Sequence, residues 1–195
     1  MTPQRNENDL MDLLERSLLV ETLMPVRVLR QGWVPMAFFA SGVPLINGES
    51  DVFSQAAKVL GDTEFAYFPL PSTPAQCASV GSSVVTDFGC VELIEKAWVE
   101  RGLPDHQSPS SASRYAFIST GGTWIIYAER SSGIGFFAVS ESVDEVRRFV
   151  VQDLLVRSGQ LITSVDELLS DSAMPYMIGV KYWDAWKTIF RESYG

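Results

Sequence analysis

The chain of 195 residues contains little histidine and little cysteine: one histidine, His106, and two cysteines, Cys77 and Cys90. Zinc sites take most of their ligands from these two residue types, so the usual zinc sites lack ligands. Two cysteines are also too few for a disulfide scaffold. No Asp-x-Asp-x-Asp-Gly calcium loop occurs. We therefore expect no metal and no cofactor.

The common catalytic and nucleotide-binding motifs are absent as well. Gly133-Ile-Gly135 lacks the third glycine of a dinucleotide fingerprint, and Gly121-Gly122 is not followed by Lys-Ser or Lys-Thr. His106 lies in a polar stretch without an evident partner. Cys90 lies at the start of a predicted helix, a position that favours a reactive thiolate, but the interpretation that the sequence favours is a small apolar residue that is buried. The sequence therefore favours a protein that is not an enzyme.

The chain also lacks long apolar runs and an excess of positive charge. No run approaches the 18 or so apolar residues of a membrane span, and the first ten residues do not form a signal peptide. The net charge is −9, with −6 on residues 1–98 and −3 on residues 99–195. Phosphates would be repelled by most of such a surface. We expect a cytoplasmic protein that binds neither membranes nor nucleic acid.

What the sequence does contain is a clear pattern of strands and helices. Residues 114–120, 123–130 and 134–139 are apolar strands joined by short turns with glycine, which predicts an antiparallel meander. Residues 26–46 and 64–70 predict further strands. Helical spacing or capping residues predict helices that cover one face of the sheet. The predicted helices are 8–24, a short one starting near 51, 90–101, one capped by Ser142, one capped by Ser164 and 178–192.

This pattern predicts the α+β class, with the meander at about 114–139 extended by N-terminal strands and packed with helices. We expect one domain, 1–195. The polar stretch 104–113 is the most linker-like part of the chain, and it is either a long loop or a boundary between two domains.

Glu129 and Arg130 at the end of the second meander strand form one candidate binding site. Neighbouring residues of a strand point to opposite faces, so one of the two should face a packed or concave side. A buried charge there would need a partner. The alternative is a hairpin end that is solvated on both faces.

Trp183 and Trp186 form a second candidate, because the C-terminal helix carries aromatic residues on more than one face. Tryptophan and tyrosine are enriched at protein interfaces, which suggests a partner or self-association as a homodimer. The alternative is that both tryptophans belong to the core.

These observations lead to two functional hypotheses. The first is a non-catalytic interaction protein, such as an immunity- or antitoxin-like inhibitor or a regulatory adaptor, whose acidic surface suits a basic protein partner. The alternative is a small-molecule-binding or enzymatic domain that uses carboxylate and arginine groups at a sheet end.

Overall fold

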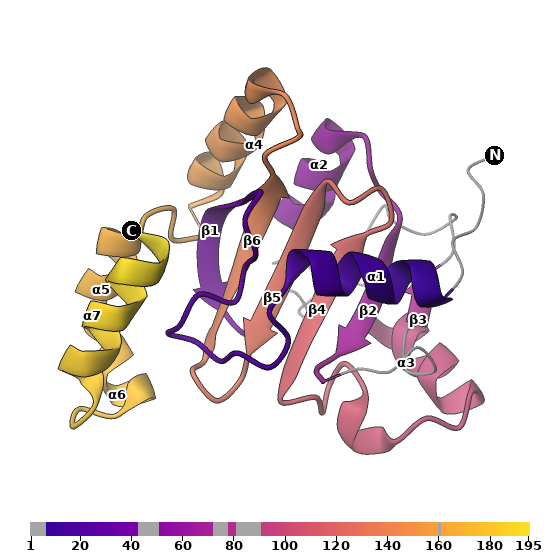
Figure 1. Ribbon diagram of the computed structural model, residues 1–195, viewed down its shortest axis with the longest axis horizontal. Helices are drawn as coiled ribbons and strands as arrows, with labels where there is room; N and C mark the ends of the chain where they lie inside the picture. The colour runs from indigo at the N-terminus through magenta and orange to yellow at the C-terminus, as the bar shows by residue number, and fades with distance from the viewer. Residues whose placement is uncertain (1–6, 43–50, 72–77, 81–90, 160) are drawn as a thin grey trace.

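A computed structural model describes residues 7–42, 51–71, 78–80, 91–159 and 161–195 (Figure 1). Cys77 and Cys90 lie outside these residues. The strands form one six-stranded antiparallel sheet in the order β1-β6-β5-β4-β2-β3. They are β1 (Trp33–Ala40), β2 (Phe65–Pro69), β3 (Ala78–Val80), β4 (Arg114–Ser119), β5 (Trp124–Glu129) and β6 (Ile134–Ser140).

The α+β class and the antiparallel meander are confirmed, with one predicted N-terminal strand on each side of the meander. The turn between β4 and β5 contains Gly122, and the turn between β5 and β6 contains Gly133. Both glycines have positive φ, 74° and 71°. Glycine adopts this conformation without steric cost, so these residues allow the tight turns that keep consecutive strands adjacent.

Helices cover both faces of the sheet, not one as expected from the sequence (Figure 1). One core lies between the sheet and α2, α3 and α4; the other lies between the sheet and α1, α5, α6 and α7. All six residues of β5 are buried, and the first five, Trp124–Ala128, alternate between the two cores. The helices are α1 (Glu7–Ser17), α2 (Asp51–Leu60), α3 (Val91–Glu100), α4 (Glu145–Ser158), α5 (Val165–Ser170), α6 (Met174–Ile178) and α7 (Trp183–Tyr194).

Two segments differ from the sequence prediction near the N-terminus. The first helix ends at Ser17 rather than at residue 24, and residues 18–32 form a loop before β1. An isolated antiparallel bridge joins Leu18 to Leu29 and closes this loop on itself. We call residues 18–32 the N-terminal loop.

The later helices also differ in detail. The N-cap of α4 is Asp144, which accepts a hydrogen bond from the Arg147 N–H, rather than Ser142. Ser164 caps α5 as predicted. The predicted helix 178–192 is replaced by α6 and α7, because Gly179 with φ 95° separates them. In the described residues, no helix is long and apolar enough to cross a membrane.

The polar stretch 104–113 contains a single 3-10 turn, η4 (Asp105–Gln107). The buried Tyr67 hydroxyl donates to the Gln107 carbonyl at 3.1 Å, and the Trp98 indole N–H donates to the Pro104 carbonyl at 3.0 Å. These bonds attach the stretch to the core on the α3 side of the sheet.

Candidate functional site

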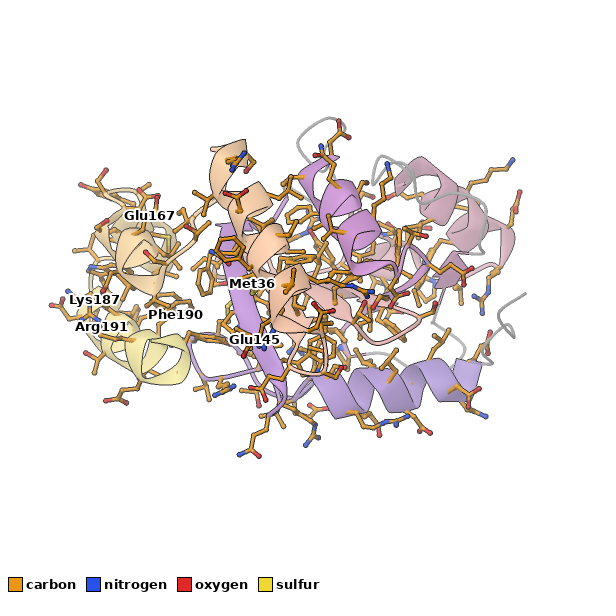
Figure 2. All side chains as sticks on the ribbon, turned by 90° about the horizontal axis from the view of Figure 1, so that it is seen from above. Met36, Glu145, Glu167, Lys187, Phe190 and Arg191 are labelled. Carbon is orange, nitrogen blue, oxygen red and sulfur yellow. The ribbon has the colours of Figure 1, made fainter. Side chains whose placement is uncertain are left out.

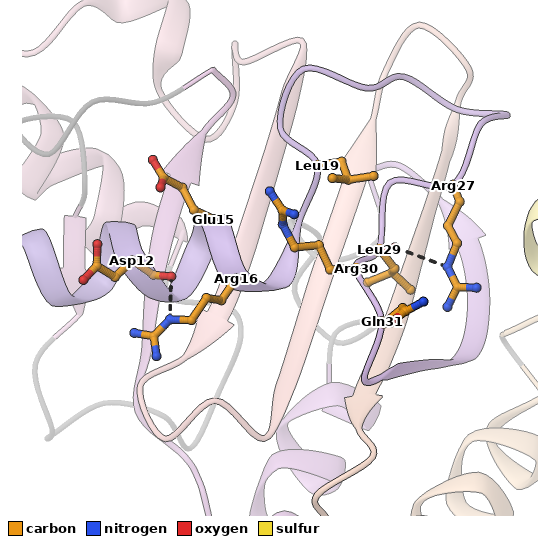
Figure 3. Close-up of a pocket in the computed structure, with 8 residues that line it drawn as sticks. All are labelled: Asp12, Glu15, Arg16, Leu19, Arg27, Leu29, Arg30 and Gln31. Atoms are coloured by element: carbon orange, nitrogen blue, oxygen red, sulfur yellow. Dashed lines mark hydrogen bonds between the residues drawn. The ribbon is translucent and has the colours of Figure 1, made fainter.

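A charged groove of about 790 Å³ lies between α1 and the N-terminal loop (Figure 3). Helix α1 buries its leucines against the sheet and turns its charged face toward this groove. The residues that line it are Asp12, Glu15, Arg16, Leu19, Arg27, Leu29, Arg30 and Gln31. We call this site the charged groove.

Three arginines of the groove are not neutralised by a carboxylate. Within the described part of the chain, no Asp or Glu oxygen lies within 4.0 Å of the guanidinium groups of Arg16, Arg27 and Arg30. The Arg16 and Arg27 Nε atoms donate to backbone carbonyls, at 3.0 Å and 3.2 Å (Figure 3). These bonds orient two side chains and leave their terminal nitrogens available for an anion.

The groove also carries negative charge at its α1 end. Asp12 and Glu15 lie on α1, whereas Arg27 lies at the opposite end, on the N-terminal loop (Figure 3). The five charged side chains are all exposed. The groove can therefore bind an anionic group near the arginines and a cationic group near Asp12 and Glu15.

Glu129, a residue singled out from the sequence, holds the N-terminal loop in place. Its side chain is only 2% exposed. It accepts hydrogen bonds from the Met24 N–H at 3.1 Å, the Tyr127 hydroxyl at 2.9 Å and the Ser131 hydroxyl at 2.7 Å. The buried carboxylate thus has the partners it needs, and one of them is the backbone of the loop.

Arg114, directly opposite Glu129 in the β4–β5 ladder, fixes the same loop from another point. Its guanidinium donates to the carbonyls of Val20 and Thr22, at 3.0 Å and 3.2 Å. The loop is also closed by two backbone hydrogen bonds, from the Leu19 N–H to the Val28 carbonyl and from the Arg30 N–H to the Ser17 carbonyl. The loop that carries Arg27 and Arg30 is therefore held by buried and part-buried polar bonds.

The C-terminal helix provides a third attachment through Tyr194. The Tyr194 hydroxyl accepts a bond from the Val28 N–H at 3.0 Å and donates to the Val26 carbonyl at 3.3 Å. Burial raises the pKa of Tyr194 and, together with the Glu129 charge, that of Tyr127. Both phenols therefore stay protonated and keep a hydrogen to donate.

Trp183 and Trp186 lie in a row of aromatic rings along α7. The Trp186 ring stacks on those of Trp183 and Phe190, with ring centroids 5.8 Å and 4.6 Å apart, and the Phe190 and Tyr194 ring centroids lie 4.7 Å apart. Trp186 is 8% exposed, and Trp183 is half-buried. In Figure 2 the labelled Phe190 of α7 points toward the sheet, where Phe38 meets it at 5.5 Å. The row attaches α7, and with it Tyr194, to the sheet.

Arg130 does not share a site with Glu129. Its guanidinium donates to the Pro109 carbonyl at 3.0 Å, and its backbone N–H donates to the Ser113 carbonyl at 2.9 Å. Both acceptors belong to the 104–113 stretch, while Glu129 contacts the N-terminal loop. The two neighbours thus secure two different loops.

Arg16, Arg27 and Arg30 are not among the site residues predicted from the sequence. Each is an ordinary surface arginine there, and no motif connects them. Their part of the chain predicts an extended segment from residue 26 onward, whereas the Leu18–Leu29 bridge brings Arg27 and Arg30 back beside α1. In the described residues, no group of three or more His, Cys, Asp or Glu side chains could hold a metal ion.

Comparisons of the chain with protein-family models, with curated proteins and with solved structures found no match.

Proposed function

We propose that this protein is a non-catalytic interaction protein, an inhibitor or an adaptor, and that it holds a carboxylate-bearing segment of a partner protein in the charged groove. The observation that carries the proposal is a set of three exposed arginines that, among the described residues, have no carboxylate oxygen within 4.0 Å. Two of them lie on a loop that polar bonds fix to the sheet and to α7. An arginine side chain binds a carboxylate with charge-assisted, often paired hydrogen bonds. A site that is already ordered loses little conformational entropy on binding.

The mixed charge of the groove narrows the kind of partner. The chain as a whole is acidic, so a purely acidic partner would be repelled from most of its surface. A segment in which basic residues flank the carboxylate can contact Asp12 and Glu15 while its carboxylate meets Arg27 and Arg30. This arrangement combines the basic partner expected from the net charge with the anionic group that the arginines require.

A second candidate function is the binding of a small anionic molecule. The groove volume of about 790 Å³ lies within the range of small-molecule sites, about 300–1,000 Å³. This candidate keeps the carboxylate and arginine chemistry expected from the sequence but moves it from Glu129 and Arg130 to the charged groove.

The test compares two probes on the same protein. The first is a fluorescent peptide that alternates glutamate and lysine, followed by polarisation at low salt; the second is citrate, followed by the thermal unfolding midpoint. We expect the peptide to bind and the double variant R27Q/R30Q to bind it at least about tenfold more weakly, since a hydrogen bond to a charged group contributes about 1.5–3 kcal/mol.

The matched control is K96Q/K181Q, which removes two exposed positive charges outside the groove. If R27Q/R30Q and this control weaken peptide binding equally, the binding is a general charge effect and the proposal is contradicted. Citrate binding that depends on Arg27 and Arg30, without peptide binding, supports the small-molecule function instead. If neither probe binds, the groove is not an anion site.

A further inference from the structure

Helix α4 exposes a stripe of large apolar side chains to solvent. Val146 is 73% exposed, Phe149 74%, Val150 43% and Val156 53%. The opposite side of the helix buries Val151 and Leu155 in the core shared with α2. We call the four exposed residues, with Asp153 between them, the α4 stripe.

A surface helix normally places polar residues on its solvent side. Figure 1 shows α4 over the β1 end of the sheet, beside α2. Isolated apolar residues are common on protein surfaces, but several large apolar side chains exposed together on one helix mark a surface that another molecule covers.

The spacing of the stripe matches that of a helix-pairing seam. Positions 146, 149, 153 and 156 are separated by three, four and three residues, which places them along one side of the helix. This spacing is the same when read from either end. Two antiparallel copies of α4 can therefore align all four positions at once, with Val146 of one copy against Val156 of the other and Phe149 against Asp153.

The charges of α4 favour a second copy of the same chain. Three arginines against Glu145 and Asp153 give α4 a charge of 3 − 2 = +1, whereas the whole chain carries −9. Two acidic molecules repel each other least where the local charge is not negative. Asp153 is paired with Arg157 at 2.9 Å, so the polar position of the stripe is already neutralised. The Arg157 guanidinium can also lie against the Phe149 ring of the other copy.

We propose that the α4 stripe is a self-association surface, on which α4 of a second copy packs antiparallel about a twofold axis that crosses the exposed side of the helix at the level of residue 151. A twofold interface requires one patch to be its own complement, and the symmetric spacing meets this requirement. One face of a 14-residue helix buries less than the roughly 800 Å² per partner of a standard interface. We therefore expect a weak dimer that is populated only at high protein concentration. This surface differs from the C-terminal helix, where the aromatic residues of the sequence suggest self-association.

The experiment is sedimentation velocity of the full chain over a wide range of concentrations. We expect the natural protein to shift from monomer to dimer and the F149E variant to remain a monomer, because the introduced carboxylate would face Asp153 of the other copy. The control is V99E on α3, where Val99 is 67% exposed outside the stripe, and it should dimerise as the natural chain does. Circular dichroism of each variant verifies that it is folded.

A mixing experiment tests the register. D153R places a positive charge opposite position 149, so a mixture of F149E and D153R chains should form a heterodimer through the introduced carboxylate and the introduced guanidinium. A natural protein that stays monomeric at every concentration overturns the proposal, and so does an F149E variant that still dimerises. A mixture that does not associate overturns the antiparallel register.

Discussion

Replacing Glu129 with alanine should lower the free energy of unfolding by more than the loss of one hydrogen bond would. The carboxylate is buried and accepts three hydrogen bonds, two of them from donors that are themselves buried, the Met24 N–H and the Tyr127 hydroxyl. Leaving a buried donor without a partner costs about 1–3 kcal/mol. Two such donors give about 2–6 kcal/mol, and removing a buried charge returns part of this cost. We expect a net loss of about 2–4 kcal/mol in the free energy of unfolding.

Urea denaturation measures this loss, and hydrogen exchange locates it. In E129A the Met24 amide should exchange much faster, because the N-terminal loop loses an attachment that fixes it to the sheet. The E129Q variant should lose less, since the amide oxygen still accepts a bond from one or two of the donors. The exposed Glu141 provides the control, and E141A should stay within about 0.5 kcal/mol of the natural protein.

A double variant separates the hydrogen bonds from the space that the side chain fills. If the unpaired Tyr127 hydroxyl causes part of the loss, then Y127F should cost clearly less in the E129A background than in the natural protein. Additive costs would contradict this explanation. A loss below about 1 kcal/mol for E129A, with unchanged exchange at Met24, would refute the role of Glu129 in holding the loop.

Three further predictions address the rest of the framework. W186A should lower the free energy of unfolding by about 3 kcal/mol in urea denaturation, and W183A by about 1 kcal/mol, because Trp186 is the more deeply buried of the two in the aromatic row. G135A should destabilise by about 1–3 kcal/mol in the same assay, because a Cβ atom there would lie 2.7 Å from the Tyr127 carbonyl oxygen and against the Phe39 ring. Burial raises the tyrosine pKa above its ordinary value at four positions in the fold. The unfolded chain loses these protons first, so the urea midpoint should be unaffected by them below about pH 10 and should fall as the pH rises further. The four positions are Tyr67, Tyr115, Tyr127 and Tyr194.

The meander of β4, β5 and β6 was predictable because its signals are local, whereas β3 (Ala78–Val80) was not predicted. The apolar runs of β4, β5 and β6 and the glycines between them lie close together in the sequence, and short turns allow only antiparallel pairing. The second helical layer was not predicted. The apolar run Trp124–Ala128 gives no clear alternation, which is typical of a strand buried on both faces, but it does not say which distant helices provide the cover. That depends on how α1 and α7 pack against the sheet in the folded chain.

The charged groove was not predictable for a stronger physical reason. Arg16 lies on α1 and Arg27 on the N-terminal loop, and they line one groove because the loop turns back on α1. Besides the local backbone bonds of the loop, the bonds that hold this turn come from Glu129, Arg114 and Tyr194, all far along the chain from the loop. The sequence indicates that a buried Glu129 needs a partner, and the structure provides three donors, one of which is the backbone of the loop. Glu129 therefore affects binding in the groove only through the loop, as a positioning residue. E129A should weaken the peptide binding of the charged groove in parallel with faster exchange at Met24, whereas R27Q/R30Q should weaken binding and leave that exchange unchanged.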